Sequence, residues 1–163
     1  MLSQYDKFDN IRCPNLKGKP KLFIVQSCRG PRFDYGVEAN TAPLPSEDQL
    51  TDASAINPHR HRRQSGGSFP SQTDILILYS STPGYVAYRD FETGTWLVNC
   101  IDTVFRDHAH EFDLCKLLRR VALKMKDLES EDGGKRMVEI CNRGFFHGLY
   151  FNPNFRKKSD KEG

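Results

Sequence analysis

Runs of apolar residues predict short strands and amphipathic helices in two parts of the chain. Residues 21–26, with the apolar Leu-Phe-Ile-Val at their centre, predict a buried strand. Residues 75–79 are a continuous apolar run, which is typical of a strand buried on both faces. Residues 95–106 and 111–128 repeat apolar side chains three and four positions apart, which predicts two helices. A last apolar run, 145–151, predicts another strand. Strands that alternate with helices favour an α/β fold with a mostly parallel sheet.

The two patterned parts are separated by a long polar stretch, residues 31–73. It is rich in Pro, Ser, Thr and Gln and far exceeds an ordinary connection, so we interpret it as a disordered or functional linker. Its run His-Arg-His-Arg-Arg at 59–63 could be a nucleic-acid or localisation patch. A solvated charge run is the better interpretation, because no aromatic residue interleaves the cations. Residues 156–163 form a charged tail.

Composition narrows the class of protein. The chain has 163 residues and a formal net charge of only +3, so we expect one domain and no nucleic-acid partner. No window approaches the roughly 18 apolar residues that cross a bilayer, and the first residues lack a signal peptide. We therefore expect a cytoplasmic protein with no membrane partner. The five cysteines are an odd number without a C-x-x-C pair, which indicates neither a disulfide framework nor a structural zinc site.

Cys28 is the candidate for chemistry. It follows the strand predicted at 21–26, and the carboxyl ends of strands in open α/β sheets are where ligands collect. The neighbouring Arg29 would place the sulfur in a positive field that favours the thiolate, while the small Ser27 and Gly30 would leave it accessible. The alternative is a structural cysteine at the end of a buried strand.

Several motifs in order give the chain a resemblance to a known family. Residues 26–30, Gln-Ser-Cys-Arg-Gly, match four of the five positions of the caspase nucleophile signature Q-A-C-[RQG]-G. Flanking segments continue the likeness, and they are the run from Cys13 to Ile24, residues 78–89, 94–96 and 149–151. The chain thus resembles the carboxyl-terminal part of a caspase over residues 11–30 and 74–153.

The resemblance implies a cysteine endopeptidase that cuts proteins after an exposed aspartate, in a proteolytic cascade of the apoptotic type. It implies that Cys28 is the nucleophile, with its own N–H in the oxyanion hole, and that no cofactor is needed. Gln26 and Arg89 match positions that bind the substrate aspartate, and a guanidinium suits a carboxylate. Tyr88 and Trp96 match aromatics that line more distal substrate pockets. The implied fold is a central, mostly parallel sheet with helices on both faces.

The family's catalytic histidine is not found where the signature places it. It should lie about 50 residues before the cysteine, yet no histidine precedes Cys28. We expect that histidine and the first strands to lie in a large-subunit segment upstream of Met1, so that the chain alone is incomplete and inactive. The alternative is a non-catalytic caspase-like protein that binds and modulates a full-length caspase.

The resemblance also divides the chain. Residues 1–30 would end the large subunit, 31–73 would be the intersubunit linker, 74–155 the small subunit and 156–163 the tail. Family members are zymogens that are cut in the linker, and Asp52, followed by the small Ala53, is the predicted processing site. The apolar run 145–151 would pair two copies as a homodimer.

Overall fold

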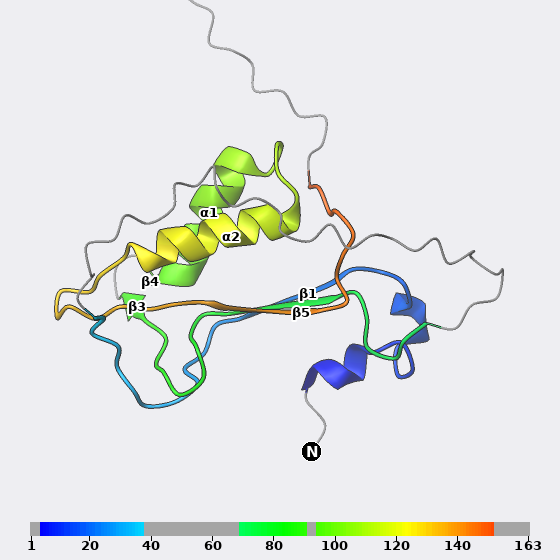
Figure 1. The fold of residues 1–163 in the computed structure, drawn as a ribbon, viewed down its shortest axis with the longest axis horizontal. Helices are drawn as coiled ribbons and strands as arrows, with labels where there is room; N and C mark the ends of the chain where they lie inside the picture. The colour runs from blue at the N-terminus through cyan, green and yellow to red at the C-terminus, as the bar shows by residue number, and fades with distance from the viewer. Residues whose placement is uncertain (1–3, 38–68, 91–93, 152–163) are drawn as a thin grey trace, which may run out of the picture. The chain divides into compact units, whose positions relative to one another are not determined.

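A three-stranded sheet organises the chain in the computed structural model, which describes residues 4–37, 69–90 and 94–151. The strands are β1 (Lys21–Val25), β2 (Ile75–Tyr79) and β5 (Glu139–Arg143), in the order β1-β2-β5 (Figure 1). β1 pairs with β2 in parallel, with Lys21 opposite Ile75, and β2 pairs with β5 antiparallel. The described sheet is therefore mixed, within the α/β class that the sequence predicts.

The central strand β2 carries the core. Its residues 75–78 are at most 1% exposed, and they alternate between two apolar clusters. Leu76 and Leu78 face the helices, while Ile75 and Ile77 pack with Tyr5 on the opposite face. A strand that is apolar on both faces needs cover on both sides, which explains its continuous apolar run.

Two helices cover one face of the sheet. They are α1 (Trp96–His108) and α2 (Leu114–Lys126), and they pack against each other and against β2. Both helices confirm the predicted apolar periodicity, within a few residues at their ends. Asp113 caps α2 by accepting hydrogen bonds from the backbone N–H groups of Cys115 and Lys116, at 2.8 and 3.3 Å.

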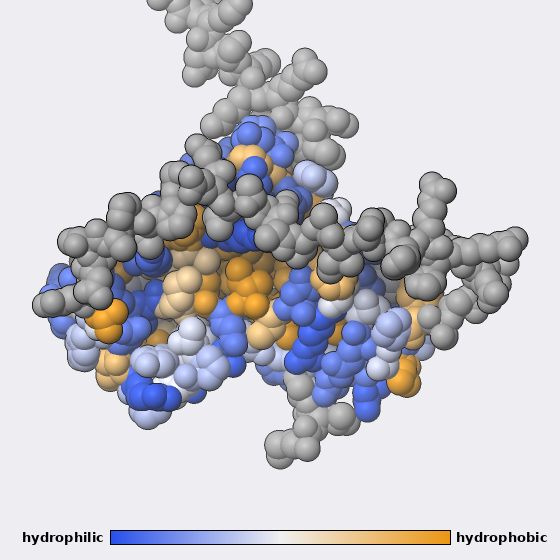
Figure 2. Space-filling model, in the orientation of Figure 1, coloured by the Kyte–Doolittle hydropathy of each residue, from blue (hydrophilic) through white to orange (hydrophobic). Residues whose placement is uncertain are grey.

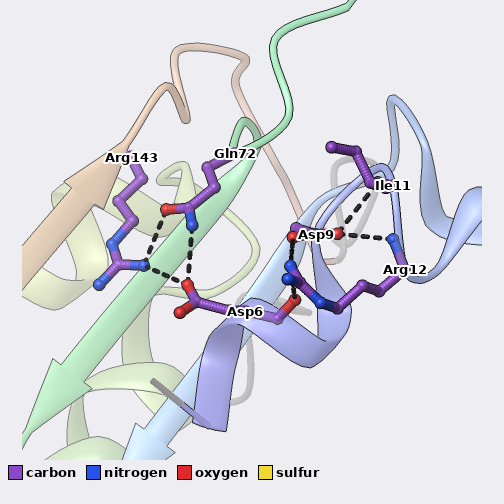
Figure 3. A network of polar contacts seen from close by, with 6 residues as sticks. All are labelled: Asp6, Asp9, Ile11, Arg12, Gln72 and Arg143. Atoms are coloured by element: carbon purple, nitrogen blue, oxygen red, sulfur yellow. Dashed lines mark hydrogen bonds and ion pairs between the residues drawn. The ribbon is translucent and has the colours of Figure 1, made fainter. Parts of the chain in front are cut away.

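The other face is covered differently from the expectation of helices on both sides. Among the described residues, it carries the short 3₁₀-helix η1 (Gln4–Phe8), with Tyr5 against the sheet, and no α-helix. Asp6 of η1 accepts a hydrogen bond from the Gln72 amide at 2.7 Å, and Arg143 contacts both residues (Figure 3). This network holds η1 to the start of β2 and the end of β5. A second 3₁₀-helix, η2 (Pro14–Leu16), precedes β1.

The strand predicted at 145–151 is wrong. The structure places the strand at 139–143 and gives 145–151 no strand. Gly144 adopts a left-handed backbone (φ 68°), and the Asn142 side chain bonds both the N–H and the C=O of Phe145, which turns the chain. Phe145 then enters the helix-side core and Phe146 is 87% exposed. The expected homodimer strand 145–151 therefore does not exist, and β5 is the strand at that edge of the described sheet.

The ends of the predicted linker belong to the main compact unit, which comprises residues 1–35 and 69–163. Arg32 forms a β-bridge with Tyr85, and the Asn10 N–H donates to the carbonyl of Ser71 at 2.8 Å. The second unit is 36–68. Asp52 and the cation run 59–63 lie outside the described residues, so the linker and its processing site stay predictions.

The surface and the helices bear on whether the described residues include a membrane span. Hydrophilic and apolar residues are interspersed over the described surface in the view of Figure 2. No described helix is long and apolar enough to cross a membrane.

Candidate active site

The site is built from two loops that follow adjacent parallel strands. The loop after β1 and the loop after β2 exchange backbone hydrogen bonds, from Arg29 N to Tyr85 O at 2.9 Å and from Gly84 N to Arg29 O at 3.0 Å. A Cβ at Gly30 would lie 2.4 Å from the backbone of Gly84, so the two loops approach as closely as glycine allows. Because both strands end at the same sheet edge, residues far apart in sequence meet there.

Two serines at the end of β2 fix the backbone before the cysteine. The Ser80 hydroxyl accepts a hydrogen bond from Ser27 N at 3.1 Å, and the Ser81 hydroxyl donates to Ser27 O at 3.1 Å. Both serines are at least 98% buried. Neither serine is among the residues predicted for the site, although polar residues directly after a buried strand could have indicated them.

Cys28 is exposed at the carboxyl end of β1. Its Sγ lies 3.3 Å from the backbone N of Ala87 and 3.8 Å from the carbonyl oxygen of the same residue. The backbone N–H of Cys28 makes no hydrogen bond with any described residue, so it is available to a developing oxyanion. No histidine nitrogen among the described residues is within hydrogen-bonding distance of the sulfur.

The guanidinium of Arg29, which is expected to place the Cys28 sulfur in a positive field, has partners on the sheet. Its guanidinium forms an ion pair with Glu139 of β5 and donates to the carbonyl of Ser81 at 3.2 Å. It also lies over the Tyr79 ring, 4.0 Å from the ring centre. The charge is therefore compensated by a carboxylate and directed at the sheet, where it ties β1, β2 and β5 together.

Three of the four expected substrate-binding residues, Tyr88, Arg89 and Trp96, follow Ala87 in the chain. Arg89 is exposed and opens the short strand β3 (Arg89–Asp90), which pairs with β4 (Gly94–Thr95). The rings of Tyr88 and Trp96 lie 4.5 Å apart, so the structure brings these two aromatics together. Gln26 is exposed beside Cys28, and no hydrogen bond in the described residues joins it to Arg89.

A buried arginine that the sequence motifs do not include packs against two aromatic rings beside the site. Arg136 is 96% buried, and its guanidinium lies 5.6 Å from the Phe33 ring and 5.7 Å from the Tyr88 ring. It lines a small hollow together with Ser81, Thr82 and Tyr85. Arg136 therefore links the nucleophile loop to the segment that carries Tyr88. Nothing in its local sequence signals this role, because the contact depends on the turn before β5.

Three other thiols, those of Cys100, Cys115 and Cys141, have surroundings that suppress ionisation. Burial raises the pKa of Cys100 and of Cys115, and it raises the pKa of Cys141, where Glu139 adds to the effect. Within the part of the chain that the structure describes, no group of histidine, cysteine and carboxylate side chains could hold a metal ion. The described site thus offers one exposed thiol and hydrogen-bond donors, the components of nucleophilic catalysis.

The described site combines an exposed strand-end thiol and an unbonded backbone amide on a mixed α/β sheet, and the comparison with known proteins identifies the family. The caspase domain matches residues 2–149, so the chain belongs to the caspase family. Caspase Dronc of Drosophila melanogaster is 33% identical over 153 residues, 92% of this chain and 34% of that protein. Human caspase-9 is 40% identical over 122 residues, 71% of this chain and 29% of that protein.

A solved structure shows the same fold. Caspase-1 from Spodoptera frugiperda superposes with a TM-score of 0.65 at 28% identity, over 85% of this chain and 49% of that one. The chain thus spans about a third of the length of these two curated relatives and about half of this solved chain.

Proposed function

We propose that the protein contributes the nucleophile and the substrate-binding residues of a cysteine endopeptidase that cleaves proteins after aspartate. The observation that carries this proposal is the placement of Cys28: an exposed thiol with an unbonded backbone N–H, at the sheet edge where two loops meet. Membership in the caspase family supports the aspartate preference. The apoptotic role, the zymogen state and a cytoplasmic location belong to the same proposal.

Each residue has a role in the proposed reaction. The Cys28 thiolate attacks the backbone carbonyl carbon of the substrate aspartate, and its own N–H stabilises the resulting oxyanion. The C–N bond after the aspartate then breaks, the amine leaves with the proton that the general base took from the thiol, and water hydrolyses the thioester. Arg89 and Gln26 bind the aspartate carboxylate, since a guanidinium fork and an amide both donate hydrogen bonds. Tyr88 and Trp96, packed as a pair, contact the residues that precede the aspartate.

The proposal requires a general base from outside the described residues. A thiol needs a partner that removes its proton, and the described polar contacts of the Cys28 sulfur are with the Ala87 backbone. We propose that the imidazole comes from a large-subunit segment that completes the sheet beside β1. We further propose that two copies pair through β5, the strand at the other edge of the described sheet.

The decisive experiment joins the chain to a caspase large-subunit segment that carries the histidine. We expect cleavage of aspartate peptides by this protein, complete loss in the Cys28→Ala variant, and little or no turnover by the chain alone. Arg89→Ala should retain the fold and lose at least about tenfold in kcat/KM for aspartate peptides, because the carboxylate loses its charged partner. Activity that survives Cys28→Ala would refute the nucleophile, and activity absent even with the histidine would favour the non-catalytic, modulating alternative.

A further inference from the structure

The outer face of α2 carries only positive charge. Within Leu114–Lys126 there are five cations and no acidic residue. These residues, which we call the basic face, are Lys116, Arg119, Arg120, Lys124 and Lys126. Arg120 is half-buried and the other four are exposed. The opposite side of the helix is sealed in the core by Leu114, Leu117 and Val121.

The cations of the basic face repel one another along the helix. Lys116 lies in the first turn, where the helix dipole favours an acid, and Lys116, Arg120 and Lys124 follow one another at four-residue spacing, where like charges repel. Within the described residues, Lys116, Arg120, Lys124 and Lys126 form no ion pair. The Phe112 ring attracts Lys116 and Arg120, and the helix dipole favours Lys124 and Lys126 in the last turn, but neither supplies a full negative charge. A helix face on which most cations lack carboxylate partners is expected where a binding partner supplies the opposite charge.

The charged neighbours limit the size of that partner. Glu111 and Asp113 precede the helix and Asp127 and Glu129 follow it, so the positive region ends at both ends of α2. Thirteen residues of helix span about 20 Å. An extended peptide of about six or seven residues spans the same length.

The surface chemistry distinguishes among anionic partners. A nucleic acid is disfavoured because the aromatic ring at this site, Phe112, is covered by Lys116 and Arg120, with cations 3.8 and 4.6 Å from its centre, and cannot stack a base. A membrane is disfavoured because the apolar side of α2 is buried and cannot enter lipid. A short acidic peptide needs only the exposed cations.

We infer that the basic face of α2 is a docking site for an acidic segment of a substrate protein, separate from the residues that hold the cleaved aspartate. This inference rests on the proposed function for the identity of the partner as a substrate. The exposed cations would bind Asp and Glu side chains at the spacing of the helix surface, about 6 Å between residues four apart. Such a site would select substrates that carry acidic sequence at a distance from the cut.

The test measures binding without catalysis. The full chain carrying Cys28→Ala is titrated into a fluorescent peptide of about ten Asp and Glu residues at about 50 mM salt, and anisotropy is read. We expect saturable binding that salt weakens, and none to an Asn/Gln peptide of equal length. Because this variant lacks the nucleophile, the result does not depend on whether the proposed protease is active.

Matched variants locate the site. Lys116→Gln with Lys124→Gln should weaken binding about fivefold, equivalent to ~1 kcal/mol, since glutamine retains helix propensity. Lys7→Gln with Lys19→Gln removes the same charge from exposed positions elsewhere and should leave affinity within about twofold. Circular dichroism confirms equal helicity. The inference would be overturned by equal weakening in both pairs of variants or by no binding at all. It would also be overturned if a single-stranded oligonucleotide or an anionic phospholipid vesicle bound more tightly than the peptide.

Discussion

Thiol reactivity follows from burial at the level of single residues. Cys28 is exposed, whereas Cys100 is 1% exposed and burial raises its pKa. A raised pKa lowers the fraction of thiolate, the form that reacts. We expect iodoacetamide at about pH 8 to label Cys28 first and Cys100 last, as read by peptide mass spectrometry over time. Equal rates for the two would contradict the exposed placement of Cys28.

Asp9 makes stability depend on pH. Its pKa is lowered, chiefly because the Arg12 N–H donates to the carboxylate at 2.6 Å, with further contributions from the Ile11 N–H and the Arg12 guanidinium. A lowered folded-state pKa stabilises the protein above about pH 4, and this stabilisation is lost as the pH falls through the folded value. Asp9→Asn should therefore lose less stability than the parent between about pH 6 and pH 3 in urea unfolding. An identical loss in both proteins would exclude Asp9 as a contributor.

At the level of elements, the N-cap of α2 can be tested against the other end of the same helix. Asp113→Ala removes hydrogen bonds to two backbone N–H groups and should lower the free energy of unfolding by about 1 kcal/mol. Asp127→Ala is the matched control, because the Asp127 side chain makes no hydrogen bond within the described residues. Denaturant titration measures both. A control that loses as much as Asp113→Ala would show that the cap bonds contribute nothing.

Sequence patterns predict helices and strands well when the buried side chains of the element form a clear apolar run or repeat. β2 is apolar at every position because it is buried on both faces, and α1 and α2 repeat their apolar side chains at helical spacing. β5 reads Glu-Ile-Cys-Asn-Arg and lies at an edge, so its residues are only half-buried or exposed and give no strong signal. The run 145–151 is rich in apolar residues and so resembles a strand in sequence, but the turn at Gly144 has already ended the strand. Phe145 is buried after this turn, and Phe146 is exposed.

In the candidate site, residues within one local motif could be predicted, whereas contacts between distant segments could not. The exposed position of Cys28 after β1 could be predicted because its neighbours form a contiguous motif, and its role as nucleophile stays a prediction. The partners of Ser27 and of Arg29 come from segments that are distant in sequence: Ser81 follows β2 and Glu139 begins β5. Such contacts depend on which strands are neighbours, and strand order cannot be obtained from local patterns. For this reason the ion pair of Arg29 with Glu139 could not be predicted from the sequence.

For the whole molecule, the predicted processing site leads to a test of assembly. An active caspase should cut the chain after Asp52 and produce a fragment that begins at Ala53, as read by mass spectrometry. The two products should elute together in gel filtration, because β1 and β2 pair along five residues and Asn10 bonds the carbonyls of Pro70 and Ser71. Asp52→Ala should resist the cut. A different new terminus would refute the site, and separate elution would refute the assembly.

The parallel pairing of β1 with β2 also governs how the chain can regain its structure. In the intact chain, residues 26–74 tether the two strands, so their encounter costs the entropy of closing one loop and does not depend on protein concentration. A cut within that loop leaves the finished sheet in place but removes the tether. Refolding of the cut protein after denaturation then becomes a bimolecular reaction whose yield falls on dilution. Cutting one peptide bond therefore changes refolding from a reaction within one chain to a reaction that needs two fragments to meet.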